Sequence, residues 1–279
     1  MVRLWKYYLS VLVLLFSCKT KETDSLAAER RALAEQVFKE AIQYGQGSPE
    51  CMRLLEKATL IDSTYAEAIR ELSVAYLKRG YPHKWKPLFD RAVRHDPKSW
   101  LIARGNIYLV SYRDYKKALA DFDAADALTP DFVDYTGGHS INFWRGMAYL
   151  GLKDYENCIV FYDKHIKKET EETGEDWVEI EAFLYRGIAK YELGNISGAK
   201  KDFEKILRYT QKSADAKYYL SKVLKQQGVI DSAKTYIERA KEDFQEGYYN
   251  QRAYVEALRQ IYWEDLIAQQ KSVDTSLSL

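Results

Sequence analysis

The chain has 279 residues, of which 47% are hydrophobic and 30% are charged, and its formal net charge is +1. A chain of this length can bury a substantial core, and its balanced charge argues against a general binder of nucleic acids or other polyanions. Three cysteines, Cys18, Cys51 and Cys158, are too widely spaced for a disulfide framework or a zinc site. Twenty-three tyrosines and only five prolines favour long, unbroken helices that pack through aromatic side chains, so the predicted class is all-α.

Residues 1–17 have the organisation of an export signal. Arg3 and Lys6 precede an apolar run from Leu9 to Phe16. This run is about half the ~20 residues that a helix needs to cross a bilayer, so it predicts a signal peptide and not a transmembrane span.

The end of that run, Leu15-Phe16-Ser17-Cys18, resembles the lipobox of bacterial lipoproteins. The resemblance implies that Cys18 is lipidated and becomes the first mature residue. Because Lys19 and not Asp follows it, the resemblance also implies sorting to the outer membrane. The alternative is a simple secretory signal with a chance cysteine. Residues 18–25 are polar and aperiodic, which predicts a flexible tether between the lipid and the folded part.

A repeat is visible further along the chain in three Arg-Gly pairs, Arg104-Gly105, Arg145-Gly146 and Arg186-Gly187, which are 41 residues apart each time (105 to 146, 146 to 187). The residues after the first pair follow the spacing of a tetratricopeptide repeat with one residue inserted: Tyr108, Ala118, Phe122, Ala125 and Pro130. The chain therefore resembles the tetratricopeptide repeat (TPR) family, and in particular the bacterial lipoproteins that contain such repeats.

Six such repeats can be laid out over residues 26–247, starting near Ala32, Ala66, Lys98, His139, Ile180 and Ala214. Each is predicted to form two antiparallel helices, with Gly at the eighth position allowing the helices to approach closely. Because each repeat has an apolar face that only its neighbour covers, we expect a TPR-like α-solenoid of about six helix-turn-helix units.

Several segments depart from the regular repeat. Residues 131–139 contain a Gly pair and predict a loop, whereas the acidic residues 167–178 predict a solvated loop or a helix extension. Cys51 and Cys158 occupy the position of a small buried residue, so we expect unreactive packing cysteines. Residues 248–270 have helical spacing and predict one C-terminal capping helix, and residues 271–279 predict a disordered tail.

The arginine of each Arg-Gly pair takes a position that is usually apolar, so each needs a partner on the second helix of its repeat. The matching positions predict that Arg104 pairs with Asp121 and Arg186 with Asp202. The corresponding position for Arg145 is Phe161. Arg145 is therefore expected to pair elsewhere, with Asp163 as a candidate, or to meet a ligand.

The resemblance also implies a partner-binding groove, lined in this family by fixed positions of each first helix. Transferred to this sequence, they are Ile102, Asn106, Leu109, Phe143, Met147, Leu150, Leu184, Ile188, Tyr191, Tyr218, Lys222 and Lys225. The stripe is apolar in the middle and basic at its C-terminal end, so something should cover it.

One possible cover of this stripe is the protein's own loops or terminal helix. The other is an apolar peptide or helix of a partner whose acidic end meets Lys222 and Lys225. The family's carboxylate clamp is not reproduced.

Residues 200–241 hold eleven Lys and Arg against five Asp and Glu. A solvated helix face explains this surplus most simply, and an acidic protein or an anionic envelope polymer is the alternative.

The sequence contains no phosphate-binding glycine loop, zinc helix or nucleophile elbow, and its four histidines do not have the spacing of metal ligands. No catalytic residue, metal site or cofactor is therefore predicted, and a structural role is expected for His165.

The leading hypothesis is a membrane-anchored adaptor of the bacterial cell envelope that holds protein or peptide partners in its groove. It would touch the membrane through the lipid only and would bind no nucleic acid. The alternative is a carbohydrate-capture envelope lipoprotein, which would use exposed aromatic side chains.

Overall fold

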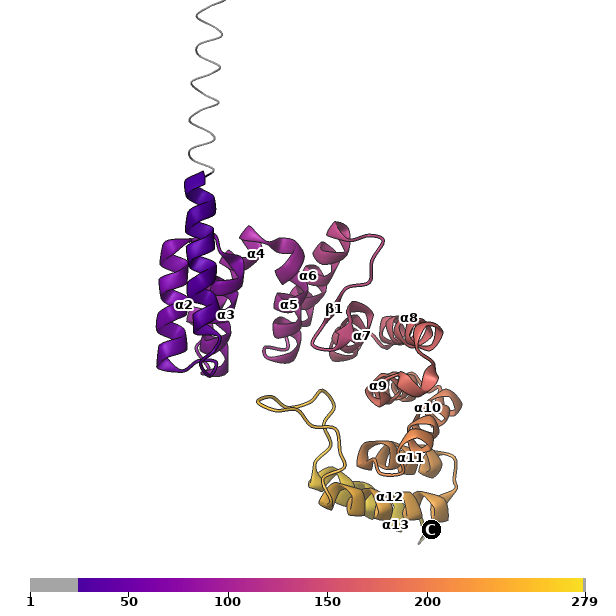
Figure 1. Ribbon diagram of the computed structural model, residues 1–279. Coiled ribbons are helices and arrows are strands. Elements are labelled where there is room, and N and C mark those ends of the chain that lie inside the picture. Colours follow the sequence, from indigo (N-terminus) through magenta and orange to yellow (C-terminus); the bar gives the residue numbers. More distant parts are fainter. Residues whose placement is uncertain (1–24, 278–279) are drawn as a thin grey trace, which may run out of the picture. The chain divides into compact units, whose positions relative to one another are not determined.

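The computed structural model describes residues 25–277, and its regular structure there is almost entirely helical (Figure 1). Residues 25–41 form the first helix described. The others are α2 (Pro49–Ile61), α3 (Ala66–Lys78), α4 (Pro82–His95), α5 (Pro97–Val110), α6 (Tyr115–Leu128), α7 (Ile141–Gly151), α8 (Tyr155–Glu172), α9 (Ile180–Glu192), α10 (Ile196–Tyr209), α11 (Ala214–Gln226), α12 (Ile230–Gln245) and α13 (Trp263–Leu277). The helices up to α12 form the six predicted pairs, so the all-α, TPR-like solenoid is confirmed.

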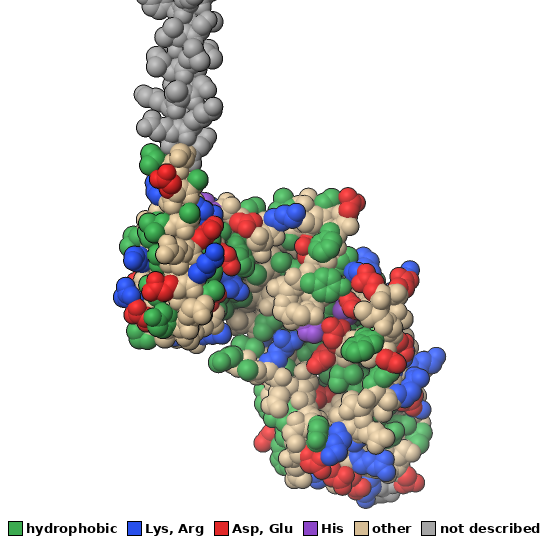
Figure 2. Space-filling model, in the orientation of Figure 1, with side chains coloured by type: hydrophobic (Ala, Val, Ile, Leu, Met, Phe, Trp, Pro, Cys, Tyr) green, Lys and Arg blue, Asp and Glu red, His purple; other side chains and the backbone are tan. Residues whose placement is uncertain are grey.

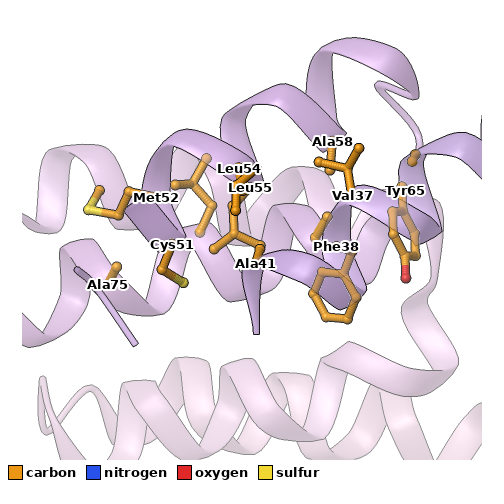
Figure 3. Close-up of a cluster of buried hydrophobic side chains, with 13 residues drawn as sticks. Val37, Phe38, Ala41, Cys51, Met52, Leu54, Leu55, Ala58, Tyr65 and Ala75 are labelled. Atoms are coloured by element: carbon orange, nitrogen blue, oxygen red, sulfur yellow. The ribbon is translucent and has the colours of Figure 1, made fainter. Parts of the chain in front are cut away.

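The chain divides into two compact units near Trp100. The N-terminal unit, residues 25–100, contains the helix over residues 25–41 together with α2, α3 and α4. Its core includes Val37, Phe38, Leu54 and Leu55, and Cys51 lies among these side chains (Figure 3). Cys51 is only 1% exposed, as a packing residue should be.

The C-terminal unit, residues 101–277, contains the remaining repeats and the residues of the predicted groove. Three of its four second helices begin where a short polar side chain caps the backbone, whereas α12 begins after Val229 without a side-chain cap. Asp114, Asp154 and Asn195 each accept a hydrogen bond from the N–H three residues on, at the starts of α6, α8 and α10. The residue before each cap has a left-handed backbone: Arg113, Lys153 and Gly194 have φ values of 51°, 61° and 78°. These caps and turns help to fix the antiparallel pairing of the third, fourth and fifth repeats.

The three Arg-Gly glycines lie where a first helix meets an aromatic ring of its second helix. A Cβ atom at Gly105, Gly146 or Gly187 would lie 2.7 Å from the ring of Phe122, Tyr162 or Phe203. Because that separation is shorter than any stable carbon–carbon contact, only Gly permits this helix spacing, and the predicted repeat register is correct.

Both extended segments have the expected character. Residues 131–139 form a loop that ends in a small hairpin, with β1 (Tyr135–Thr136) antiparallel to β2 (His139–Ser140). Its two-residue turn uses Gly137 and Gly138, whose φ values of 57° and 85° favour glycine. The acidic segment continues α8 to Glu172 and ends in a 3₁₀ turn, η1 (Glu175–Trp177).

The predicted C-terminal helix over residues 248–270 is wrong in its position. Residues 248–262 are irregular, and the terminal helix α13 runs from Trp263 to Leu277, through most of the tail predicted to be disordered. The helix does cap the last repeat, because α13 packs against α12 and α11. Its buried side chains include Leu266 and Val273. We call residues 248–262 the arm.

The predicted signal peptide, the lipidation site Cys18 and residues 18–24 of the tether lie outside the described residues, and residue 25 is already helical. Within residues 25–277, no helix combines the length and the apolar character needed to span a membrane.

Candidate functional site

The predicted groove residues lie together on the first helices of the C-terminal unit, but most of them are buried. Seven apolar members are no more than 6% exposed: Ile102, Leu109, Phe143, Met147, Leu150, Leu184 and Ile188. The remaining members are partly exposed: Asn106, Tyr191, Tyr218, Lys222 and Lys225. The apolar middle of the predicted groove is therefore not an open surface.

The arm contributes to this burial. Figure 1 shows it as the yellow loop that leaves α12 and α13 and extends along the repeats toward α5. Asn250 anchors its base: the backbone N–H donates to Asp215 Oδ2 at 2.7 Å, and Nδ2 donates to the Tyr185 hydroxyl at 2.8 Å. Further along, Leu258 faces a cavity of about 10 Å³ that Leu109 and Met147 also line.

Charged arm residues fasten the rest of the segment. The Arg252 guanidinium lies 5.4 Å from the ring centroid of Trp144 on α7. Arg259 donates to the Tyr155 hydroxyl at 3.0 Å and lies 3.1 Å from a Glu192 carboxylate oxygen. Of the two covers considered from the sequence, these contacts favour the protein's own chain. The arm belongs to the segment predicted as the terminal helix, and His139 of the first long loop stacks on Phe143 with 4.2 Å between ring centroids.

The basic end of the predicted groove remains open. A pocket of about 350 Å³ lies between α9, α11 and α13, and its lining residues are Tyr191, Lys222, Lys225, Gln226, Gln269 and Ser272. Lys225 donates to Ser272, and Gln269 donates to Ser221 at 3.2 Å. We call this cavity the basic pocket.

Lys222 is held by aromatic rings. Its ammonium lies 5.1, 5.4 and 5.6 Å from the ring centroids of Tyr191, Tyr218 and Tyr219. Burial lowers the pKa of Lys222, and no carboxylate within residues 25–277 lies at ion-pair distance from it. Since a partly buried ammonium gains from a nearby anion, the basic pocket favours a carboxylate or another anionic group.

Two of the predicted arginine pairs are confirmed. Arg104 binds Asp121 through two hydrogen bonds of 2.8 and 2.7 Å, and Arg186 binds Asp202 through two of 3.0 and 2.6 Å. Both aspartates are buried, so these bidentate pairs link the helices of their repeats.

Arg145 does pair outside the matching position, as expected, but the candidate Asp163 is wrong: Arg145 bonds to Asp123 and Asp126 of the preceding repeat, whereas Asp163 bonds to Arg186. Because the matching position is Phe161 and not an acid, Arg145 bonds to carboxylates of the neighbouring repeat. A free arginine for a ligand is therefore not present at this position.

A chain of hydrogen bonds joins the hairpin to two helices. Ser140 Oγ lies 2.9 Å from His165 Nδ1, and His165 Nε2 lies 2.9 Å from Glu179 Oε2. The other oxygen of Glu179 lies 2.9 Å from His139 Nδ1. Burial acts to raise the pKa of Glu179, but the hydrogen bonds from the two histidines outweigh it and hold that pKa well below its usual value.

The order serine, histidine, acid is that of a nucleophilic triad, but the packing here is structural. Ser140 and His165 have no exposed surface. Ser140 Oγ also accepts from the Phe143 N–H as the N-cap of α7. A substrate could not reach this hydroxyl, so the chain fastens the hairpin to α8 and α9, and the structural role expected for His165 fits this geometry.

The remaining polar features are dispersed. Residues 25–277 contain no cluster of three His, Cys, Asp or Glu side chains suited to a metal ion. Cys158 is fully buried, and burial raises the pKa of its thiol, which keeps it in the unreactive form. On the face shown in Figure 2, acidic and basic side chains alternate over the surface.

Models of the tetratricopeptide repeat match two segments of the sequence, residues 139–167 and residues 181–209. These segments correspond to most of the fourth and fifth predicted repeats. Among curated proteins, no relative matches the sequence.

Solved structures resemble the fold at low sequence identity. PilW, described as a widely conserved type IV pilus biogenesis factor, is 16% identical with a TM-score of 0.60, covering 76% of this chain and 94% of that chain. Pseudomonas aeruginosa PilF is 17% identical with a TM-score of 0.59, covering 79% and 97%. YrrB, described as a TPR protein with an unusual peptide-binding site, is 16% identical with a TM-score of 0.52, covering 68% and 91%. These likenesses show the fold alone.

Proposed function

We propose that this protein is a lipid-anchored interaction scaffold of the bacterial cell envelope, which binds an acidic segment of a partner protein at the basic pocket. Tetratricopeptide solenoids are generally protein-binding scaffolds and not enzymes, and repeats of this type are present here. The observation that carries the proposal is Lys222, a partly buried ammonium that faces an open pocket without a carboxylate partner in the described chain.

The geometry restricts how a partner can bind. The arm and neighbouring side chains bury the apolar middle of the groove, so a partner that leaves the arm in place meets only the basic end. There Lys222 and Lys225 offer positive charge, while Tyr191 offers an aromatic surface. A peptide with an acidic side chain or a C-terminal carboxylate next to an apolar residue suits this combination.

Photo-crosslinking in cells tests the partner site. A photoreactive residue at Gln226, an exposed position on the pocket wall, should give one dominant crosslinked species. Adding Lys222→Gln and Lys225→Gln should reduce that species at least ~10-fold, because two charge-assisted contacts are lost. The matched control is Lys201→Gln, at an exposed lysine of α10 outside the pocket. Equal crosslinking by the double variant would remove the basic pocket as the partner site.

The anchor is supported by the sequence around Cys18 and has its own test. Radiolabelled palmitate should be incorporated into the wild-type protein and absent from Cys18→Ala, which should move to the aqueous phase of a detergent partition. A protein held by more than one acyl chain should remain in the membrane fraction after a salt wash. Label retained in Cys18→Ala would contradict lipidation at this residue, whatever the outcome at the basic pocket.

A further inference from the structure

A second cavity lies at the opposite, N-terminal end of the same first helices, where the base of the arm meets α9 and α11. Its volume is about 310 Å³, close to the lower limit of ~300 Å³ for small-ligand sites. Leu184 and Ile206 give it an apolar wall, Tyr249 and Asn250 come from the arm, and Glu181 and Asp215 supply two carboxylates. We call it the acidic pocket.

Asp215 is the unusual member of this site. The residue is 2% exposed, and its Oδ2 accepts the Asn250 N–H at 2.7 Å. Its other oxygen, Oδ1, is buried and has no hydrogen-bond partner. A buried oxygen without a hydrogen-bond donor lowers the free energy of unfolding by roughly 1–3 kcal/mol, and by more if it carries charge. Such a position calls for an explanation.

The lysines near the cavity do not provide the missing donor. Lys212 pairs with Glu246 and lies 4.6 Å from the ring centroid of Tyr248. Lys217 pairs with Asp243 at 2.5 Å. Among residues 25–277, no cation lies at ion-pair distance from either Glu181 or Asp215.

Two carboxylates without a counter-ion therefore face one cavity from adjacent repeats. Burial raises the pKa of Asp215 from 3.8 to about 7, and the charge of Glu181 acts in the same direction. A cation bound between them would oppose both effects. A metal ion fits less well, because residues 25–277 do not place a third acidic, histidine or cysteine ligand beside these two carboxylates.

We infer that the acidic pocket binds the ammonium group of a protonated primary amine, with Asp215 Oδ1 and Glu181 as acceptors and the alkyl chain along Leu184 and Ile206. The size and apolar wall suit an amine on a short alkyl chain. That chemistry is shared by the side chain of a lysine in a polypeptide and by a free alkyl diamine. This site is separate from the basic pocket and does not depend on the proposed scaffold function.

Binding can be measured with defined probes on the purified protein. Nα-acetyl-lysine methylamide represents a lysine within a chain, 1,5-diaminopentane represents a free amine, and Nα,Nε-diacetyl-lysine methylamide is the neutral control. We expect saturable binding of at least one amine by calorimetry, with at least tenfold weaker binding of the diacetyl compound. Preference for the lysine analogue assigns the amine to a polypeptide, whereas preference for the diamine assigns it to a small molecule.

Substitutions locate the binding. Asp215→Asn and Glu181→Gln should each weaken amine binding at least tenfold, and Glu204→Gln, at an exposed carboxylate of α10, should leave it unchanged. Glu181 is only partly buried, so its variant remains informative if Asp215→Asn does not fold. The inference is overturned if neither amine binds, if the neutral compound binds equally well, or if a folded variant keeps the wild-type affinity.

Discussion

Three glycines set the distance between paired helices in repeats three to five, and each faces an aromatic ring. At Gly187 a methyl group would lie 2.7 Å from Phe203, whose side chain is fully buried and cannot move aside. The higher helix propensity of Ala, worth ~1 kcal/mol, would not offset the forced separation of the two helices.

We therefore expect Gly187→Ala to lower the free energy of unfolding by about 1–3 kcal/mol, measured by urea denaturation. Gly45→Ala is the matched control, because a Cβ there meets nothing within 4 Å. That control should change the free energy of unfolding by less than about 0.5 kcal/mol. A neutral Gly187→Ala would mean that α9 and α10 do not pack as closely as described.

Glu179 joins two histidines that come from different segments, the hairpin and α8. Its pKa is depressed in the folded protein, so its ionised form stabilises the fold at pH values above its unfolded pKa, near 4.5. That stabilisation declines as the pH falls below 4.5, because the unfolded chain takes up a proton there while the folded carboxylate does not, and it is fully lost below the depressed pKa of the folded state.

Glu179→Gln should therefore lower the free energy of unfolding by about 1–3 kcal/mol at pH 7, as expected for lost hydrogen bonds to a charged group. The difference from wild type should shrink as the pH falls from 4.5 toward 3, followed by urea denaturation at each pH. Glu171→Gln, at a more exposed carboxylate of α8, should have little effect at any pH. A difference that does not depend on pH would contradict an ionised Glu179.

At the scale of the element, the arm covers part of the concave face, where Leu258 lies beside Leu109 and Met147. Its sequence has the spacing of a helix, yet Asn250 and Arg259 hydrogen-bond to side chains of the solenoid and Arg252 lies over the Trp144 ring. The segment therefore remains irregular because its polar and charged groups have partners on α7, α8, α9 and α11. The arm lies over positions of the first helices that would bind a peptide if the groove were open.

This arrangement predicts the outcome of placing a charge in the groove. Phe143 and Ile188 are completely buried, so Phe143→Glu or Ile188→Glu should cost at least about 4 kcal/mol or prevent folding. Val160→Glu, at a position 46% exposed on α8, should leave the melting temperature nearly unchanged. If the two groove variants fold with wild-type melting temperatures, the groove is open and the described burial is wrong.

At the scale of the whole molecule, ion pairs explain why the surplus of basic residues in 200–241 does not form a continuous basic surface. Several lysines of residues 200–241 pair with acids elsewhere in the C-terminal unit: Lys205 with Glu175, Lys212 with Glu246, and Lys217 with Asp243. Ion pairs with acids outside this stretch thus balance part of the surplus, and one of these lysines, Lys217, is buried and does not lie on a solvated face. Lys222 differs from these lysines because it faces tyrosines in place of a carboxylate, which is why the proposed partner site lies there.

The repeats could be read from the sequence because solenoid contacts are local. Gly105 packs on Phe122 and Arg104 bonds to Asp121, all within one repeat, so a fixed spacing predicted both contacts. The Arg145 pair was missed because its acids lie in the preceding repeat. The sequence contains only a weak indication of the acidic pocket: Glu181 and Asp215 both occupy the second position of their repeats, which are adjacent.

By itself, then, the sequence determined the all-α solenoid, its six helix pairs, two of the arginine pairs and the apolar stripe along the first helices. Only the tertiary structure decided that this stripe is buried and that pockets remain at its two ends. The physical reason is the distance along the chain between the contacting groups. Glu256 meets Arg113 from 143 residues away, and Arg259 meets Tyr155 from 104 residues away. Helical periodicity in the sequence shows where the apolar residues of the arm recur. The side chains that bind the arm in an irregular conformation come close to it only after the repeats have stacked.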